Sequence, residues 1–497
     1  MRRLAATLAF ILLGPAFATP SLAALTMGGP ATAKSRTGSD DISPSGTQAG
    51  SIEAQRAAAR ADMVDRILQL ATWCNEKELF IERDRLWRKV LEIAPDDASA
   101  RKGLRYARNV DGSWKEPPPR ELKNLGKKWL EEFAKREDAV GTPYGDALLA
   151  LARVEGRTVA ERDILIAEIK SLAPNHAGLH AWLGNVQLGD RWVLPETATA
   201  KERRMKIRAD AKRLMEVGAP FAPEKPNEAE AAFGIAWKVV LQGENVRIVS
   251  TGTEEEAVRI GRAAEGAGVL LSIVIGTDMR FPGAYTIYVL TEPGEKEAFL
   301  AKLPGITEEE RTRLMGLEGT GIPRSTNVAL FGKDPVRRAD AAVRHTIGHI
   351  MALTLAVSHK TAWAWEGIGQ YLTRELVGTR LTWFVSEGAD AGSADLRGKL
   401  MTPDSNWIQE AFDLLSTGTA VPIEDLLRRD LDRLEVEGAL TGYALVAYLI
   451  EGRPDAVLGF VTRAARGEDP AKITSEVLDM TPGELQVRLV QWLSERR

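Results

Sequence analysis

Three side chains in the second half of the chain have the types and the spacing of a metal site. His345 and His349 lie four residues apart in the segment HTIGH, and sixteen residues separate His349 from Glu366. Histidines at positions i and i+4 share one face of a helix, so both imidazoles can reach one ion. Two histidines and a carboxylate suit zinc, and a catalytic zinc site leaves its fourth position to water. The spacing therefore indicates one zinc ion held between two neighbouring helices.

A second histidine pair provides an internal control for this spacing. His176 and His180 are also four residues apart, but no Trp-x-x-Glu-Gly motif follows them. We interpret them as solvated or helix-capping residues, because the spacing alone is a weak signal. His345 and His349 differ because the segment WAWEGIGQY, residues 363–371, follows them and carries Glu366. The combination makes His345 and His349 the candidate pair for chemistry.

Taken together, HTIGH and WAWEGIGQY resemble the gluzincin metallopeptidases, and more closely their peptidase-MA-like branch. Members of that family carry His-Glu-x-x-His, a short gap and Trp-x-x-Glu-Gly-x-Ala-x-Tyr. The resemblance extends over about residues 235–497 and implies that His345, His349 and Glu366 bind one zinc ion. It also implies a small strand-rich subdomain before the histidine helix and further helices at the end of the domain.

The chain departs from that family pattern at two positions. Thr346 stands where the family has its catalytic glutamate, and Gly369 stands where it has a small alanine. In the family, zinc lowers the pKa of its bound water towards about 7, and the glutamate takes the proton of that water. A threonine hydroxyl cannot accept a proton near neutral pH, and general-base assistance contributes about 10²–10⁴-fold in rate. Retained ligands beside a lost base predict a non-catalytic zinc- and peptide-binding pseudopeptidase.

Two other interpretations stay open. One is an active zinc-dependent peptidase with an unusual general base, and the other is a structural envelope scaffold without metal. His359, in the loop between the two helices, is the candidate base or extra ligand. Asp340 lies off the metal-facing stripe of an ideal helix, and Glu375 lies more than two turns beyond Glu366. Side chains packed in front of Glu366 would favour the scaffold.

Four aromatic residues complete the candidate site. Tyr443 and Tyr371 could polarise a bound carbonyl, although such tyrosines are more often core residues whose hydroxyl is satisfied. Trp363 and Trp365 would line the cleft or belong to the core. We expect the cleft to hold a peptide or a protein segment.

The elements that position these residues follow from caps and periodicity. Asp334-Pro335 predicts a helix from Pro335 to about Leu355, and Thr361 can cap the next helix. A capping-box pattern at Thr253 predicts a helix to about Gly266, and the chain is mostly helical after Asn406. Strands followed by helices indicate an α+β domain. The strands are predicted at residues 237–241, 245–250, 269–275, 285–290 and 327–331.

The rest of the chain divides by composition. Residues 1–23 have the basic start, apolar run and small-residue end of a signal peptide. Residues 24–51 are small and polar, which predicts a disordered linker, and residues 52–215 show helical periodicity. The Pro-rich segment 218–228 is the expected boundary before a domain at 229–497. The predicted fold class is therefore α+β, with an all-α repeat region before a gluzincin-like domain.

An internal repeat supports the helical region. Residues 94–117 and 173–195 both begin with Ala-Pro, continue into an Ala-rich helix and reach a Gly shortly before a Trp. Two copies about eighty residues apart suggest tetratricopeptide-like helix hairpins that stack to bury a shared core. Such arrays commonly bind proteins, so this region is a possible second partner surface.

Charge and cysteine content bound the partners and the compartment. The net charge of −4 gives no case for nucleic acid, and no membrane span is expected after signal cleavage. Because residues 1–23 are predicted to be a signal peptide, the mature protein is expected to be exported, to the periplasm, to the cell envelope or out of the cell. Its single cysteine, Cys74, can form no internal disulfide, and we interpret it as a small buried hydrophobe.

Overall fold

The computed structural model describes residues 46–118, 121–279, 281, 283, 285–317, 319–322, 325–385 and 391–496. Two compact units divide between Val193 and Leu194. The predicted signal peptide and linker residues 24–45 lie outside the described residues. Helix α1 (Gly46–Glu76) begins six residues before Ile52, where the helical region is predicted to start. Residues 46–51 contain no proline, so the helix extends backwards from Ile52 without a steric break.

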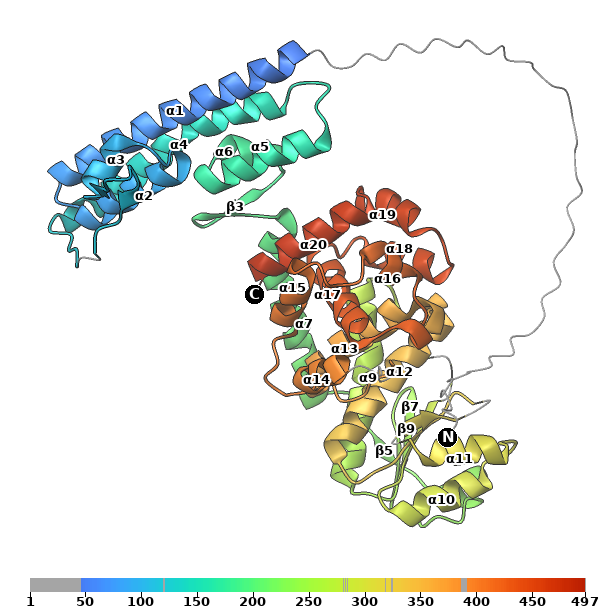
Figure 1. Cartoon of the computed structure of the whole chain (residues 1–497). Coiled ribbons are helices and arrows are strands. Elements are labelled where there is room, and N and C mark those ends of the chain that lie inside the picture. Colours follow the sequence, from blue (N-terminus) through green and yellow to red (C-terminus); the bar gives the residue numbers. More distant parts are fainter. Residues whose placement is uncertain are drawn as a thin grey trace, which may run out of the picture. The chain divides into compact units, whose positions relative to one another are not determined.

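The first unit contains two copies of the same series of elements (Figure 1). A helix pair is followed by a short helix and an antiparallel hairpin. The first copy contains α1, α2 (Phe80–Ile93), α3 (Ala98–Gly103), β1 (Ala107–Arg108) and β2 (Trp114–Lys115). The second contains α4 (Leu130–Ala152), α5 (Val159–Leu172), α6 (Ala177–Trp182), β3 (Val186–Leu188) and β4 (Arg191–Val193), and the 3₁₀ turn η1 (Lys127–Trp129) precedes it.

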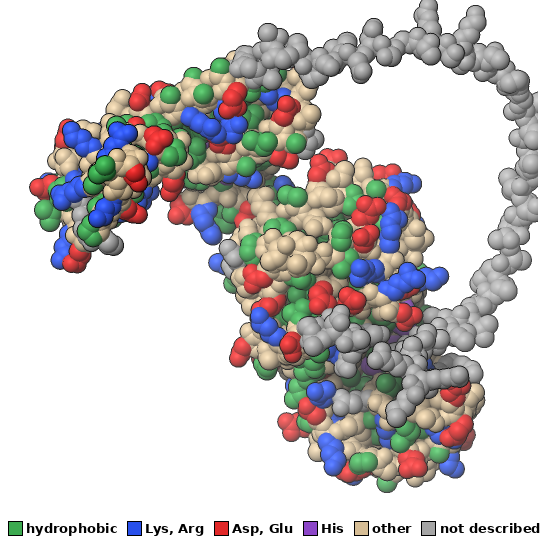
Figure 2. Space-filling view, viewed as in Figure 1, with side chains coloured by type: hydrophobic (Ala, Val, Ile, Leu, Met, Phe, Trp, Pro, Cys, Tyr) green, Lys and Arg blue, Asp and Glu red, His purple; other side chains and the backbone are tan. Residues whose placement is uncertain are grey.

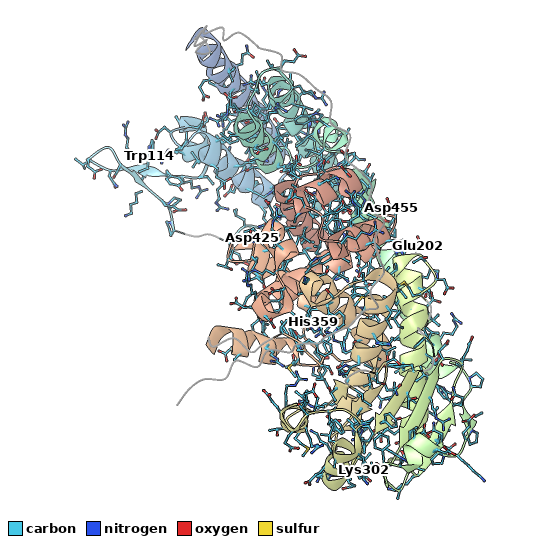
Figure 3. The ribbon with its side chains drawn as sticks, turned by 90° about the vertical axis from the view of Figure 1, so that its right-hand side faces the viewer. Trp114, Glu202, Lys302, His359, Asp425 and Asp455 are labelled. Carbon is cyan, nitrogen blue, oxygen red and sulfur yellow. The ribbon has the colours of Figure 1, made fainter. Side chains whose placement is uncertain are left out.

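Equivalent residues start the short helix of each copy. The Asp97 side chain caps α3, and the His176 side chain caps α6 at the same position after the Ala-Pro pair. The helices of both copies share one apolar core that contains the fully buried Cys74. The hairpins are solvent-exposed instead, and Figure 3 shows the one that carries Trp114 projecting from the helices. The duplicated sequence therefore encodes duplicated structure.

The second unit contains a six-stranded mixed sheet in the order β5-β6-β7-β8-β10-β9. Strands β7, β8 and β10 are parallel, whereas β5, β6 and β9 pair antiparallel with their neighbours. The strands are β5 (Ala222–Pro223), β6 (Val239–Gln242), β7 (Val246–Ser250), β8 (Tyr285–Val289), β9 (Gly319–Gly321) and β10 (Val328–Leu330). The edge strand β9 follows α11 and lies beside β10.

Helices cover both faces of this sheet. Helices α9 (Glu254–Ile275) and α12 (Pro335–Leu355) contribute to the apolar core on one face. Helices α10 (Pro293–Lys302) and α11 (Glu308–Met315) contribute to the core on the other face. Residues of β6, β7, β8 and β10 are shared between the two cores, as the alternating side chains of a β-strand require. The short helix α8 (Glu228–Ala231) precedes β6.

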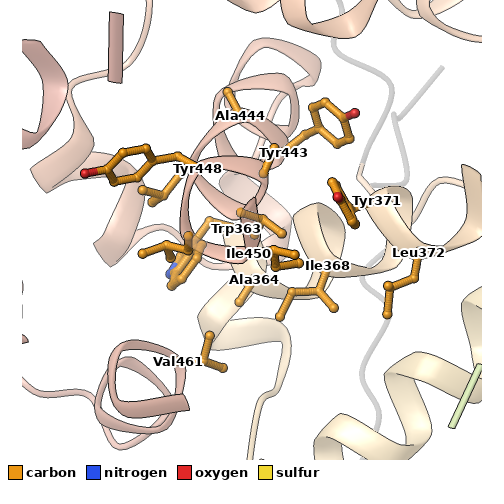
Figure 4. Close-up of a cluster of buried hydrophobic side chains, with 14 of the residues drawn as sticks. Trp363, Ala364, Ile368, Tyr371, Leu372, Tyr443, Ala444, Tyr448, Ile450 and Val461 are labelled. Atoms are coloured by element: carbon orange, nitrogen blue, oxygen red, sulfur yellow. The ribbon is translucent and has the colours of Figure 1, made fainter. Parts of the chain in front are cut away.

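The largest core lies among the helices that follow the sheet. Helix α13 (Ala362–Val377) crosses α17 (Val436–Gly452) at close range, and Figure 4 shows their interlocked side chains. Glycines permit this approach, because a Cβ on Gly367 would lie 2.7 Å from the carbonyl oxygen of Gly442. The other helices here are α14 (Ala391–Leu400), α15 (Trp407–Ser416), α16 (Ile423–Arg428), α18 (Val457–Ala465), α19 (Pro470–Leu478) and α20 (Pro482–Arg496).

The structure differs from the sequence prediction at several points, and two short antiparallel hairpins lie within the region predicted to be all-α. The strand predicted at 269–275 is the end of α9, because this apolar run is buried in a helix core, and its periodicity cannot separate a strand from a buried helix. The unit boundary falls at residues 193/194 rather than at 218–228. Helix α7 (Pro195–Glu216) packs with the second unit, where Glu196 pairs with Arg488 at 2.9 Å.

The secondary-structure content agrees with the predicted α+β fold class. The chain is mostly helical with a small mixed sheet, as expected for an α+β protein. Within the described residues, no helix combines the length and the apolar content that crossing a bilayer requires. On the face shown in Figure 2, acidic and basic side chains are interspersed, in line with a net charge of −4.

Candidate functional site

The two helices predicted to carry the site lie side by side. Helix α12 begins where the Asp334 carboxylate accepts a hydrogen bond from the backbone N–H of Val336 at 2.8 Å, and it has the predicted bounds. Helix α13 follows the 3₁₀ turn η2 (His359–Thr361), although the Thr361 side chain makes no capping hydrogen bond. A Cβ on Gly348 would lie 2.7 Å from the Trp365 ring, so glycine allows the close packing of α12 on α13.

Glu366 is fully buried, and protein groups occupy both of its carboxylate oxygens. Oε1 accepts a hydrogen bond from the backbone N–H of Phe384 at 2.9 Å. Oε2 accepts one from the Gln370 side chain at 3.3 Å and lies 3.0 Å from Nη2 of Arg344. The Arg344 side chain is 1% exposed and that of Glu366 is 0% exposed, so this is a buried ion pair.

Arg344 is held on several sides. Its Nε donates to the carbonyl of Thr382 at 3.0 Å, and Nη1 donates to the carbonyl of Trp365 at 3.3 Å. The guanidinium also lies over the Phe384 ring, 4.9 Å from its centroid. Nη2 makes no well-aligned hydrogen bond, so it faces the Glu366 carboxylate as an ionic contact. The guanidinium therefore occupies the space in front of Glu366.

The two histidines point to different neighbours. His345 meets the Phe384 ring edge-on at 5.2 Å, and His349 stacks on Tyr285 at 5.4 Å with its Nε2 buried and without a hydrogen-bond partner. Burial, with a smaller effect of the Arg344 charge, lowers the pKa of His345 to about 4. Burial also lowers the pKa of His349. Both imidazoles are therefore neutral at physiological pH.

Thr346, at the position of the missing glutamate, is 1% exposed and faces the sheet. Its hydroxyl donates a hydrogen bond to the Tyr285 hydroxyl at 3.2 Å. Burial raises the pKa of Tyr285, so the phenol stays protonated and cannot act as a base. The structure thus places no proton acceptor at this position.

As placed, the predicted ligands do not fit a zinc ion. Among the described residues, no three or more His, Cys, Asp or Glu side chains converge on one point. Glu366 has no free oxygen, and a divalent cation beside it would also face the positive charge of Arg344. Zinc binding stays a prediction, but the donor set in this arrangement favours the metal-free alternative.

Most of the remaining candidates are core residues. Tyr371 donates to Glu451 at 2.9 Å, and Tyr443 accepts from Arg380 at 2.9 Å, so neither hydroxyl is directed at Glu366. Trp363 is fully buried between helices, as Figure 4 shows.

His359 and Trp365 lie at the margin of the site. Their rings meet edge-on at 5.2 Å, and Figure 3 marks the position of His359. Burial lowers the pKa of His359, while the charges of Asp432 and Glu366 raise it by less. Trp365 also packs near Phe384, so it belongs to the wall around the Arg344 guanidinium.

Sequence reasoning missed the segment that closes the site, residues 379–385, which we call the strap. Asp340 anchors its start, because one carboxylate oxygen accepts from Thr379 Oγ1 and the N–H of Leu381, and the other accepts from the N–H of Thr382, each at 2.8 Å. Glu366 holds its end at Phe384. One signal was available, since Asp340 and Arg344 are charged residues within an otherwise apolar helical run.

The control histidines have structural roles. Nδ1 of His176 accepts from the N–H of Leu179 at 2.9 Å, which makes it the N-cap of α6. His180 hydrogen-bonds the carbonyl of Pro174 at 2.6 Å and stacks on Trp192 at 4.9 Å. The interpretation of His176 as a capping residue is confirmed, and His180 is buried rather than solvated.

No protein-family model and no curated protein sequence matches the chain. The resemblance to the gluzincins therefore depends on the two motifs.

Proposed function

We propose that the second unit is a metallopeptidase-like domain that does not hydrolyse peptides, and that this exported protein acts by binding. The observation that carries the proposal is the environment of Thr346. In a gluzincin this position needs a carboxylate that can take a proton from the attacking water. Here a buried hydroxyl is hydrogen-bonded to a second hydroxyl, on Tyr285.

Other acids and bases near the motif are engaged elsewhere. The Asp340 carboxylate binds the strap through three hydrogen bonds. Glu375 pairs with Arg208 at 3.1 Å, on the side of α13 that meets α7. His359 packs on Trp365 rather than on His345 or His349. A substitute general base therefore has no support in the contacts of these residues.

Because Arg344 fills the space in front of Glu366, which is also what a scaffold would show, the binding of a peptide or protein segment is proposed at the edge of the sheet and not in front of Glu366. Strand β9 is the outer strand of the sheet, and Gly319 on it lies close to the His345 ring. The outer edge of a sheet can accept an extended segment through main-chain hydrogen bonds, although Thr320 in the middle of β9 is itself buried. The duplicated helical unit, with its exposed hairpins, would offer a second partner surface. The predicted signal peptide supports placing this activity outside the cytoplasm.

The test is a peptidase assay on residues 24–497 purified after export. Cleavage of a fluorescence-quenched peptide library is measured with added zinc, with a chelator and with neither. His349→Ala serves as the matched control, because it removes a predicted ligand but leaves Glu366 and Arg344 unchanged. We expect no chelator-sensitive cleavage above the His349→Ala background. Cleavage that depends on metal and on His349 would refute the proposal.

A further inference from the structure

We propose that the Arg344 guanidinium is a tethered cation that permanently occupies the charge position a metal would fill beside Glu366. The inference deepens the proposed function and rests on it for the comparison with a metal site. The site would then be a binding position for a planar guanidinium ion, and the wild-type protein would need no metal as the counter-charge beside Glu366.

This binding position has the composition that a guanidinium requires. Its polar walls are the Glu366 carboxylate and the carbonyls of Trp365 and Thr382, all acceptors within 3.3 Å of a guanidinium nitrogen. The Phe384 ring closes one face at 4.9 Å. A guanidinium carries only donors and packs favourably on an aromatic face. Acceptors around the rim and an aromatic ring on a face match that ion better than a metal ion, which needs converging lone pairs.

Gly369 is the second, independent observation. A Cβ at this position would lie 1.2 Å from Nη1 of Arg344, which is far inside any permitted contact. Alanine at position 369, as in the gluzincin pattern, therefore excludes the observed guanidinium position. From sequence alone Gly369 is a conservative replacement of alanine, but in the structure it leaves the space that Arg344 occupies.

Charge explains why the two cations exclude each other. A buried carboxylate without a counter-ion is strongly unfavourable, so Glu366 requires one positive neighbour. Arg344 supplies it from the preceding helix at 3.0 Å. A zinc ion bound to the same oxygen would lie within a few ångströms of the guanidinium, where like charges repel strongly in a low-dielectric core. With the Arg344 guanidinium in place, Glu366 therefore needs no zinc ion as its counter-charge.

A double-mutant cycle between Arg344 and Gly369 tests the geometry. In the wild-type background, Gly369→Ala forces the guanidinium out, and we expect a marked fall in the Tm of the second unit by scanning calorimetry. In an Arg344→Ala background the same change meets no guanidinium, so it should leave Tm unchanged or raise it. Gly398→Ala is the matched control, since it lies on helix α14 with nothing within 4 Å of the added Cβ.

Chemical rescue tests the identity of this binding position. Arg344→Ala leaves the Glu366 carboxylate without its cation and should lower Tm by on the order of 10 °C. Millimolar guanidinium chloride, far below the molar range that denatures proteins, should raise the Tm of this variant and not that of wild type. Methylammonium at equal ionic strength should rescue less. If Arg344→Ala does not fold, Arg344→Lys replaces it in this experiment, because lysine keeps the positive charge but not the planar donors. The Tm of Arg344→Lys is then compared with that of wild type.

Metal content completes the test. Mass spectrometry of wild type should find no stoichiometric zinc, before or after reconstitution. One zinc per chain that is lost in His349→Ala would overturn the tethered-cation proposal even if no peptide is cleaved. Equal effects of Gly369→Ala in the two backgrounds, or no rescue by guanidinium, would overturn it as well. Peptide cleavage alone would instead refute the proposed function, so the two failures are distinguishable.

Discussion

Replacing Asp340 with alanine is expected to release the strap from α12. The Asp340 side chain is fully buried and accepts three hydrogen bonds of 2.8 Å, from Thr379 Oγ1 and from the backbone N–H groups of Leu381 and Thr382. Arg344 on the same helix also donates to the carbonyl of Thr382 at 3.0 Å, so Asp340 is one of two direct ties between α12 and the strap. The perturbation therefore removes an anchor while leaving Glu366 and Arg344 in place.

The magnitude follows from the number and the type of these bonds. A hydrogen bond to a charged group contributes about 1.5–3 kcal/mol, and bonds that share one acceptor are not additive. Leu381 and Thr382 are only partly buried, so water recovers some of the loss. We expect Asp340→Ala to destabilise the strap by about 3 kcal/mol. Asp334→Ala, on the same helix but with one capping bond, should cost about 1 kcal/mol.

Hydrogen exchange of the strap amides measures this local opening directly. A loss of about 3 kcal/mol corresponds to roughly a hundredfold faster exchange at Leu381 and Thr382, because each 1.4 kcal/mol is tenfold. Asp334→Ala should leave those two amides close to their wild-type rates. Strap amides that exchange alike in Asp340→Ala and Asp334→Ala would refute the idea that Asp340 holds the strap.

Four further predictions concern single side chains. His345 has a pKa of about 4 in the folded protein and about 6.5 in the unfolded chain, so the unfolded chain is protonated first as the pH falls. The free energy of unfolding should therefore decrease by up to about 3 kcal/mol between pH 7 and pH 4. His345→Gln should reduce this pH dependence, as urea titrations at each pH will show. Burial raises the pKa of Cys74 to about 12, so a thiol reagent at pH 8 should label it only after unfolding, and rapid native labelling would contradict its buried position. His176→Ala should cost about 1 kcal/mol in the first unit through loss of the α6 cap, whereas His176→Asn should be milder, as thermal unfolding of the two variants will show. Thr346→Glu alone should give no peptidase activity, because Glu366 stays paired with Arg344; activity from this single change would show that the pair does not block the site.

Local signals in the sequence predicted the elements that carry the site. Asp334-Pro335 marks the start of α12, and strands close to the predicted 285–290 and 327–331 are present as β8 and β10. Edge strands were missed because β5 is Ala-Pro and β9 is Gly-Thr-Gly, segments of two or three residues in which Thr320 alone favours a strand. Long apolar or capped elements are thus readable locally, whereas short edge strands depend on their neighbours in the sheet.

The partners of the site residues could not be predicted in the same way. The spacing correctly placed His345, His349 and Glu366 on adjacent helices. It carries no information on which side chain pairs with the Glu366 carboxylate. That depends on the strap, whose return over α12 is fixed by bonds between residues about forty positions apart. Asp340 and Arg344, four residues apart, have the spacing of a surface ion pair, yet each binds the strap and both are buried.

The two departures from the family pattern act on different parts of the chemistry. Thr346 faces Tyr285 on the sheet and removes the proton acceptor. Gly369 lies against Arg344 and leaves space for the cation that pairs with the Glu366 carboxylate. Restoring a glutamate at position 346 would return a base but would leave Glu366 bound to Arg344. Restoring an alanine at position 369 would expel the guanidinium but would supply no base. Neither change alone would supply both a base and a Glu366 carboxylate without its arginine partner, so under the proposed function the contacts of α12, α13 and the strap act together against hydrolysis.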